Sequence, residues 1–171
     1  MAESVRKHAG LRIRPAGIDD LDALLRLCAE HARHEGCEYS AEGKHAGLLR
    51  ALSTSPPRLW LWVAQAGDEL VGYAAASREF STWQASDFLH LDCLYVGAAQ
   101  RDAGIGAALL QTVASHAEQC GLQEIQWQTP VWNQDAARFY RRAGATEKSK
   151  LRFSWRPDSL RIGTAKPSIP E

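Results

Sequence analysis

Apolar residues along the chain follow two spacings, one typical of strands and one typical of helices. Strand-like runs occupy residues 11–14, 59–64, 70–76, 88–96, 124–129 and 150–155. The runs 59–64 and 70–76 flank a turn that contains Gly67 and Asp68, which predicts a hairpin. Residues 80–86 are expected to form a loop before the next strand.

Apolar spacing of three and four residues predicts four helices. The first begins after Asp19 and Asp20 and ends near Glu35, where Gly36 stops it. The second spans 41–52, before a run of Ser and Pro. The third has an apolar face made of Ile105, Ala108, Leu109, Thr112, Val113 and His116, and Gly121 closes it. The fourth begins at the N-cap Asn133 and ends at Gly144, with Ala136, Phe139, Tyr140 and Ala143 at helical spacing.

The order β-α-α-β-β-β-α-β-α-β predicts an α/β (α+β) fold. We expect a mixed, mostly antiparallel central sheet of six to seven strands with helices on both faces. A chain of 171 residues is long enough for one domain with a good core. That domain is expected over residues 11–156, after a flexible lead at 1–10. A flexible tail is expected at 157–171, where Pro, Ser, Gly and charged residues dominate.

The 20 basic and 20 acidic residues cancel, so no global field favours nucleic acid or a membrane surface. No apolar run approaches the length of a membrane span, and we expect a cytoplasmic protein. The cysteines at 28, 37, 93 and 120 lack the close spacing of a zinc site. No metal is therefore expected, and reduced thiols are expected in a cytosol.

Residues 100–106 read Gln-Arg-Asp-Ala-Gly-Ile-Gly and lie between an apolar strand and an amphipathic helix. Glycine lets the backbone approach a ligand, and the first N–H groups of a helix have no partner within it. This combination predicts an anion site whose natural occupant is a phosphate or pyrophosphate. The loop lacks the Lys-Ser/Thr pair of a P-loop and the three glycines of a dinucleotide fold. A plain structural turn and a nucleotide-binding domain remain alternatives.

Two segments together carry a more specific signal. Residues 101–106 resemble the Arg/Gln-x-x-Gly-x-Gly/Ala signature of the GNAT-superfamily N-acetyltransferases. Residues 133–145 resemble the Asn-x-x-Ala-x-x-Phe-Tyr-x-x-x-Gly-Phe/Ala segment of the same family. The resemblance implies a GNAT-like fold whose fourth and fifth strands splay apart, and it implies direct acetyl transfer from acetyl-CoA to a primary amine.

The resemblance also implies which residues hold acetyl-CoA. They are Leu94, Tyr95, Val96, Arg101, Asp102, Ala103, Gly104, Ile105, Gly106, Asn133, Ala136, Phe139 and Tyr140. Backbone N–H groups of 101–106 would bind the pyrophosphate. Backbone groups of Leu94 and Val96 would pair with the pantetheine arm, and an N–H near Leu94 would stabilise the oxyanion.

Tyr140 matches the family tyrosine that protonates the departing thiolate, although periodicity alone also fits an aromatic core residue. The segment 91–96 resembles a stretch of the diamine (spermidine/spermine) and thialysine acetyltransferases, in which Asp92 takes the place of a glutamate. Asp92 is therefore the candidate base, acting through water; a structural salt bridge is the alternative. Cys93 replaces the next acid of that stretch and could carry a covalent acyl group.

Candidate residues for binding the amine acceptor lie at the end of the first predicted helix. Glu35 could bind an ammonium, and His31 or His34 could relay a proton. Trp83 and Trp132 could line the acceptor pocket. The alternatives are a solvated helix end with cationic residues at its negative pole and tryptophans that belong to the core.

We expect an acetyl-CoA-dependent N-acetyltransferase that acts on a small diamine-like, amino-acid-like or antibiotic amine. A protein or peptide acceptor and a non-catalytic acyl-CoA-binding module are the alternatives. Because the family often dimerises through C-terminal strands, the alternating segment 151–155 predicts a homodimer. No nucleic-acid or membrane partner is expected.

Overall fold

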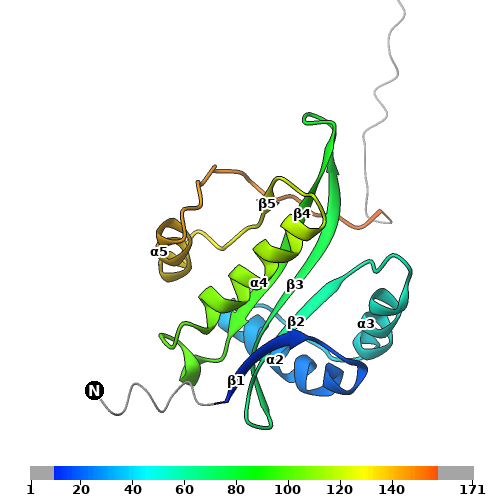
Figure 1. The fold of residues 1–171 in the computed structure, drawn as a ribbon, viewed down its shortest axis with the longest axis vertical. Helices are drawn as coiled ribbons and strands as arrows, with labels where there is room; N and C mark the ends of the chain where they lie inside the picture. The colour runs from blue at the N-terminus through cyan, green and yellow to red at the C-terminus, as the bar shows by residue number, and fades with distance from the viewer. Residues whose placement is uncertain (1–9, 158–171) are drawn as a thin grey trace, which may run out of the picture.

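The structure of the protein is a computed structural model, and it describes residues 10–157 (Figure 1). The expected lead and tail therefore lie outside the described residues, apart from Gly10 and Pro157. The strands are β1 (Leu11–Pro15), β2 (Trp60–Ala66), β3 (Glu69–Ser81), β4 (Ser86–Val96) and β5 (Ile125–Gln126). The helices are α2 (Leu21–His34), α3 (Lys44–Ser53), α4 (Ile105–Gln119) and α5 (Gln134–Arg142), with short 3-10 turns η1 (Ile18–Asp20) and η2 (Ala98–Gln100).

The strands form one sheet in the order β1-β2-β3-β4-β5. The first four pair antiparallel in sequence, and β5 joins β4 in parallel after the crossover through α4. The predicted mixed, mostly antiparallel α/β sheet is therefore confirmed. The predicted number of six to seven strands is wrong, because residues 10–157 contain five.

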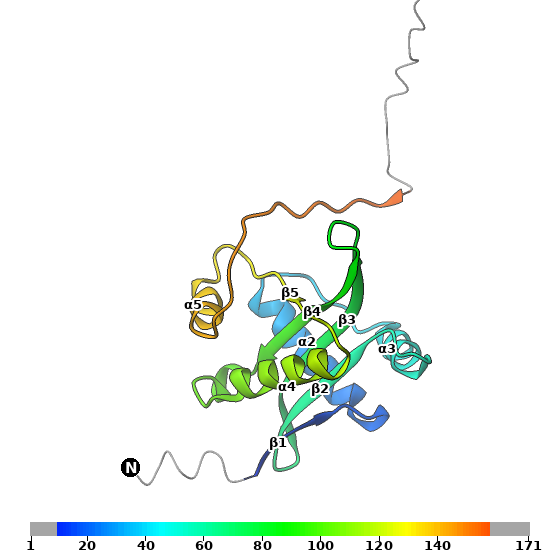
Figure 2. The ribbon, with the colours of Figure 1, turned by 45° about the horizontal axis from the view of Figure 1, so that its top comes forward.

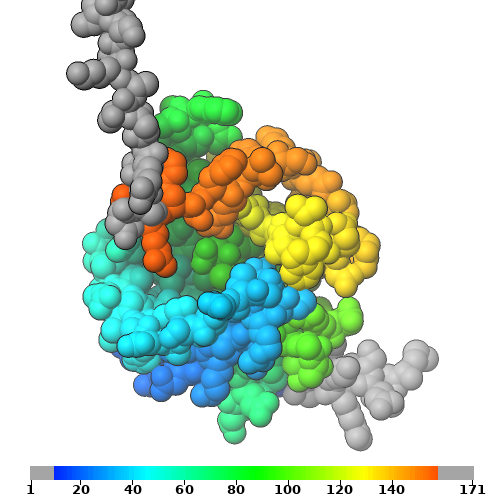
Figure 3. Space-filling model, turned by 180° about the vertical axis from the view of Figure 1, so that it is seen from behind, coloured from blue at the N-terminus to red at the C-terminus, as the bar shows by residue number. Residues whose placement is uncertain are grey.

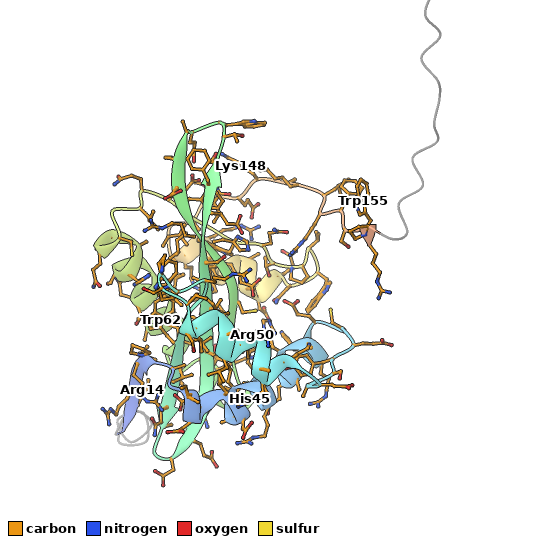
Figure 4. All side chains as sticks on the ribbon, turned by 90° about the vertical axis from the view of Figure 1, so that its right-hand side faces the viewer. Arg14, His45, Arg50, Trp62, Lys148 and Trp155 are labelled. Carbon is orange, nitrogen blue, oxygen red and sulfur yellow. The ribbon has the colours of Figure 1, made fainter. Side chains whose placement is uncertain are left out.

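The missing strand is the segment 150–155, which is extended but pairs with no strand in the described chain. Its apolar side chains Leu151, Phe153 and Trp155 are between 71% and 84% exposed. Figure 4 shows Trp155 far from the sheet that contains Trp62. Alternation predicts the extended conformation of a segment, but a strand also needs a neighbouring backbone to bond with.

Two separate cores lie on the two faces of the sheet, with α4 on one face and α2 on the other (Figure 2). Leu109 and Val113 of α4 are fully buried against β-strand residues that include Leu89. Leu21 and Leu24 of α2 are buried on the opposite face. Burial of such side chains stabilises the fold by about 1.5–3 kcal/mol each. The predicted cover of both faces by helices is thus confirmed.

The β3–β4 hairpin is longer than predicted. Residues 80–86 were expected to be a loop, but pairing continues to Ser81↔Ser86, and only a short turn separates the strands. The side chains beyond Ala76 are mostly polar and exposed. The apolar pattern therefore ended where the core ended, whereas the two strands continue beyond the core as a ribbon.

Two irregularities of β4 shape the region around the candidate site. Opposite Asp92 the register with β3 shifts from Ala75↔Cys93 to Ala76↔Leu91, which makes Asp92 the extra residue of a β-bulge. Pairing with β5 stops at His90↔Gln126, although β4 continues to Val96. The predicted strand 124–129 is therefore only two residues long, and the two neighbouring strands separate after it.

No helix within residues 10–157 is long and apolar enough to cross a membrane. The described cysteines at 28, 37, 93 and 120 are all free thiols.

Candidate active site

The loop after β4 turns twice into the left-handed region before α4 begins. Asp102 has φ 63° and Gly104 has φ 77°. Glycine suits the second position because it has no Cβ to resist a positive φ, and aspartate is among the few residues that tolerate the first. Ala108 N–H is the first to bond back to the helix start, at Gly104 O. The N–H groups of the first turn therefore point out of the helix end, where they suit an anion.

Gly106 lies where α4 meets both β4 and α5. A Cβ added there would lie 3.7 Å from Phe139 Cζ and 3.9 Å from Val96 Cγ2. The predicted donor-binding residues of the loop and of the last helix are therefore close together in space. The Arg101 side chain turns back instead: its Nε donates to Val96 O at 3.2 Å, and its guanidinium lies 5.8 Å from the centre of the Tyr95 ring.

The end of β4 presents backbone groups to the side where β5 has separated. Gly97 N–H donates to Val71 O of β3 at 2.9 Å. Because consecutive residues of a strand direct their N–H and C=O groups to opposite edges, those of Leu94 and Val96 point away from β3. This open edge can pair with an extended ligand arm as if that arm were another strand.

Tyr140 comes from α5, which starts at its predicted N-cap. Asn133 Oδ1 accepts from Ala136 N–H at 3.1 Å and so fixes the first turn of the helix. The Tyr140 ring packs on Trp127, with ring centres 5.0 Å apart. Burial raises the pKa of Tyr140 to about 12, with smaller contributions from the Glu35 carboxylate and the Cys93 thiol nearby. The phenol therefore keeps its proton at neutral pH and is available as an acid.

Asp92 is exposed at the bulge. Its carboxylate accepts from Cys93 Sγ at 3.5 Å and forms no ion pair with any other residue between 10 and 157. The salt-bridge alternative is therefore wrong for the described chain. A bulge turns the extra side chain out of the regular ladder, and here it places a carboxylate at the surface beside a half-buried thiol.

Cys93 is a thiol rather than a thiolate. Burial raises its pKa to about 12, and the neighbouring Asp92 carboxylate contributes in the same direction. A thiolate is the reactive form in covalent catalysis. These surroundings argue against the covalent acyl-cysteine alternative.

His31 connects the buried interior to the carboxylate at the end of α2. Its Nδ1 lies 2.9 Å from the Tyr73 hydroxyl, and its Nε2 lies 3.4 Å from Glu35 Oε1. Burial raises the pKa of Tyr73 far above its usual range and lowers the pKa of His31. The neutral imidazole therefore accepts a hydrogen bond from the Tyr73 hydroxyl at Nδ1, and its Nε2–H faces Glu35, which holds that carboxylate in place.

The other acceptor-side candidates divide into two groups. The His34 ring lies 5.8 Å from the Trp132 ring and 6.4 Å from the Tyr95 ring, so these side chains gather above the end of α2. Trp83 is 97% exposed in the turn between β3 and β4 and does not join them. Figure 3 shows a hollow on this face, bordered by the light-blue end of α2, the yellow segment before α5 and the orange segment after it.

A cavity of about 410 Å³ lies between the end of α2 and the loop after β4. It is lined by Glu30, Arg33, His34, Tyr95, Ala98 and Arg101. Sequence reasoning missed Glu30, Arg33 and Tyr73. The first two share a helical face with His34, a spacing of three and four residues that could have identified them. Tyr73 is 42 residues from His31 in the chain, and no local pattern joins them.

Within the described chain, no group of three or more His, Cys, Asp or Glu side chains is arranged to hold a metal ion. The polar groups in this region are hydrogen-bond donors, namely backbone N–H groups and a phenol, and acceptor carboxylates. This set suits group transfer from an anionic, extended donor to a cationic acceptor.

Comparison with known proteins agrees with this arrangement. The chain is 25% identical over 165 residues to the thialysine N-epsilon-acetyltransferase of Mus musculus, a match that covers 90% of this chain and 96% of that protein. It is 28% identical over 145 residues to spermidine/spermine N(1)-acetyltransferase-like protein 1 of Homo sapiens. That match covers 81% of this chain but only 21% of the longer human protein.

The fold also matches solved structures. An aminoglycoside acetyltransferase from an uncultured soil metagenomic sample superposes with a TM-score of 0.75 at 17% identity, over 87% of this chain and 97% of that one. At this identity the likeness shows the fold alone. The model of the acetyltransferase (GNAT) family matches residues 39–145, which is more than half of the 171 residues. The chain therefore belongs to the acetyltransferase (GNAT) family and is an N-acetyltransferase.

Proposed function

We propose that this N-acetyltransferase transfers the acetyl group of acetyl-CoA directly to a primary amine of a small diamine-like, amino-acid-like or antibiotic molecule. One observation carries the proposal. The Glu35 carboxylate after α2 and the Cys93 thiol of β4 both lie near enough to Tyr140 of α5 to raise its pKa, and Asp92 is hydrogen-bonded to Cys93. An acid and two carboxylates are thus found near the part of β4 that β5 leaves unpaired.

Acetyl-CoA would be held as a substrate by the loop and by β4. The N–H groups of 101–106 face the pyrophosphate at the start of α4, as the left-handed Gly104 allows. The backbone groups of Leu94 and Val96 pair with the pantetheine amides. Arg101 Nε occupies Val96 O in the structure, so the guanidinium must give up that bond to an arm that pairs there.

The acceptor must lose a proton before it can attack, because a primary ammonium has a pKa near 10. Glu35, held by His31, attracts the ammonium into the site. Asp92 takes the proton, directly or through one water, because its carboxylate is exposed and lies near enough to His31 to affect the pKa of that imidazole. The freed amine nitrogen then forms a bond to the thioester carbonyl carbon.

The tetrahedral adduct places negative charge on the former carbonyl oxygen. A main-chain N–H near Leu94 is the candidate donor for that oxyanion. As the C–S bond breaks, the sulfur leaves as a thiolate, whose ordinary pKa is near 8.5. Tyr140 donates its proton to this sulfur. After the C–N bond has formed, the nitrogen is cationic and loses a second proton, which restores the phenol, while the first proton leaves Asp92 for the solvent.

A turnover screen tests the function. We expect thiol release from acetyl-CoA with at least one amine in a panel of polyamines, lysine analogues, aminoglycosides and peptides. Release with peptides alone would favour the protein-acetylating alternative. Tight CoA binding without release across the whole panel would favour the non-catalytic module and overturn the proposal.

We also propose a cytoplasmic homodimer. The free thiols at 28, 37, 93 and 120 suit a reducing compartment. The exposed apolar side chains of 151–155 suit burial between two copies.

A further inference from the structure

A buried hydroxyl lies behind the acceptor end of the proposed site and has no part in the proposed transfer steps. Tyr73 is only 3% exposed, and its Oη lies 2.9 Å from His31 Nδ1. On the other side of the imidazole, Nε2 lies 3.4 Å from Glu35 Oε1. Glu35 lies near enough to Tyr140 to raise its pKa, and Asp92 lies near enough to His31 to affect the pKa of the imidazole. Tyr73 is thus connected through one side chain to the groups proposed to handle the amine.

The surroundings of the Tyr73 hydroxyl decide where its proton points. The thiols of Cys28 and Cys93 lie near enough to affect its pKa, and burial raises the pKa of both thiols, so they keep their protons. A thiol sulfur is a weak acceptor, whereas the free nitrogen of a neutral imidazole is a good one. Burial also keeps His31 neutral by lowering its pKa. The Tyr73 O–H therefore points to Nδ1, and the single imidazole proton is on Nε2.

This proton determines how His31 acts on Glu35. An N–H group at 3.4 Å attracts the carboxylate, whereas the lone pair of the other tautomer would repel it. The plane of the imidazole is restrained by Tyr95, whose ring stacks on it at a centroid distance of 4.9 Å and an interplanar angle of 21°. Tyr95 and Tyr73 are paired residues on the neighbouring strands β4 and β3. The sheet thus sets both the orientation and the tautomer of a histidine that belongs to α2.

We infer that Tyr73 is a positioning residue for the acceptor amine: its hydroxyl keeps the hydrogen of His31 on Nε2, and through it keeps the Glu35 carboxylate where the ammonium binds. The inference rests on the proposed function and adds a residue of β3 to those that set the affinity for the acceptor. Because Tyr73 acts through His31, its loss affects the KM for the amine rather than the chemical step.

Tyr73→Phe removes the hydroxyl and keeps the ring. With the amine of the panel that has the highest kcat/KM, we expect the KM for the amine to rise by about fivefold, the effect of one hydrogen bond, while kcat and the KM for acetyl-CoA change by less than about twofold. Tyr39→Phe is the control, because the Tyr39 hydroxyl also lies near the Cys28 thiol but comes from the segment after α2. An unchanged KM for the amine, or an equal rise in both KM values, would overturn the inference.

A double-mutant cycle separates positioning from a role of the hydroxyl in packing. His31→Leu removes the tautomer that Tyr73 sets, so adding Tyr73→Phe to it should leave the KM for the amine unchanged. His31→Gln should keep part of the affinity that His31→Leu loses, because its amide can donate to Glu35. An equal effect of Tyr73→Phe with histidine and with leucine at position 31 would show that the hydroxyl acts without His31, and would contradict the inference.

Nitrogen NMR of isotope-labelled histidine decides the inference even where no amine is acetylated, because the two ring nitrogens report which of them carries the proton. The spectrum of His31→Gln identifies the signals of His31. At neutral pH, wild type should show the Nε2–H tautomer, and Tyr73→Phe should show a changed Nδ1 signal and a share of the Nδ1–H tautomer. The Nδ1–H tautomer in wild type, or identical His31 signals in both proteins, would reject the inference. Expected NMR signals without any turnover would count against the proposed function alone.

Discussion

At the scale of single residues, burial sets the protonation state of the groups around the candidate centre. The Tyr140 phenol and the Cys93 thiol both have a pKa near 12 and stay protonated at neutral pH, whereas His31 has a lowered pKa and stays neutral. Negative charge is left to Asp92 and Glu35 at the edge of the site. In the proposed function, a cationic amine would therefore interact with these carboxylates, whereas the phenol and the thiol keep their protons.

Removing the Tyr140 hydroxyl should slow the chemical step. We expect Tyr140→Phe to lower kcat by about a hundredfold, the low end for loss of a positioned acid, while the KM for acetyl-CoA changes little. Steady-state thiol release measures both quantities. Tyr39→Phe is the matched control, since Tyr39 lies in the segment after α2, outside the proposed centre. An unchanged kcat in Tyr140→Phe would reject the acid role.

Neutral, half-buried His31 should make stability depend on pH. Its pKa is lowered in the folded state, so the unfolded chain takes up the proton first as the pH falls below about 6.5. The contribution of neutral His31 to the free energy of unfolding is therefore complete above that pH and is lost as the pH falls. Urea unfolding at about pH 7.5 and pH 5.5 should show a smaller loss for His31→Gln than for wild type.

A second histidine limits the difference in acid sensitivity between wild type and His31→Gln. Burial also lowers the pKa of His116, and His116 is present in both proteins. His45→Gln, a substitution at a half-exposed side chain, should behave like wild type. Equal acid sensitivity of wild type and His31→Gln would contradict the lowered pKa of the half-buried imidazole.

At the scale of elements, α4 and its preceding loop carry the proposed donor site. Gly104 and Gly121 lie at opposite ends of α4, both with positive φ and open space around the position of a Cβ. An L-residue at either glycine should destabilise the fold by about 1 kcal/mol. Only Gly104 lies at the helix end where anions bind.

Gly104→Asp should therefore weaken CoA binding by about tenfold or more, because its carboxylate would repel the pyrophosphate at the positive helix end. Gly121→Asp, with the same backbone strain at the other end of α4, should leave the affinity unchanged. Calorimetric titration of both variants with CoA measures the difference. Equal affinities would show that the loop is only a turn.

The elements also show how far the sequence alone reaches. Helical spacing and end signals placed α2, α4 and α5 correctly, because caps and apolar stripes are local features. The bulge at Asp92 and the contact of Tyr73 with His31 could not be predicted, since both depend on which strands lie side by side. The prediction of a strand at 150–155 was wrong, because alternating apolar and polar residues do not show whether another strand is available for pairing.

At the scale of the whole molecule, the exposed end of the described chain is its least compact part. Leu151, Phe153 and Trp155 alternate with polar residues and are mostly exposed, while the outer edge of the sheet beyond β5 is open. An unpaired edge and an apolar strand-like segment favour pairing between chains. Two copies could bury these side chains against each other's sheets.

Light scattering after size exclusion tests this assembly. Wild type should elute as a dimer, and the double variant Phe153→Ser, Trp155→Ser should shift toward monomer because the apolar contact is lost. Trp83→Ser removes an equally exposed tryptophan at the β3–β4 turn and should stay dimeric. A monomeric wild type at micromolar concentration would overturn the proposed homodimer.

Asp92 is the extra residue of the bulge in β4 and has no partner residue on β3. Without it, the pairs Ala76↔Leu91 and Ala75↔Cys93 would form one uninterrupted ladder, and every other side chain of β4 would keep its face. A single codon gained or lost at this point would therefore add or remove the candidate base while both cores stay intact. In this strand, the candidate base and the core are therefore specified by different residues.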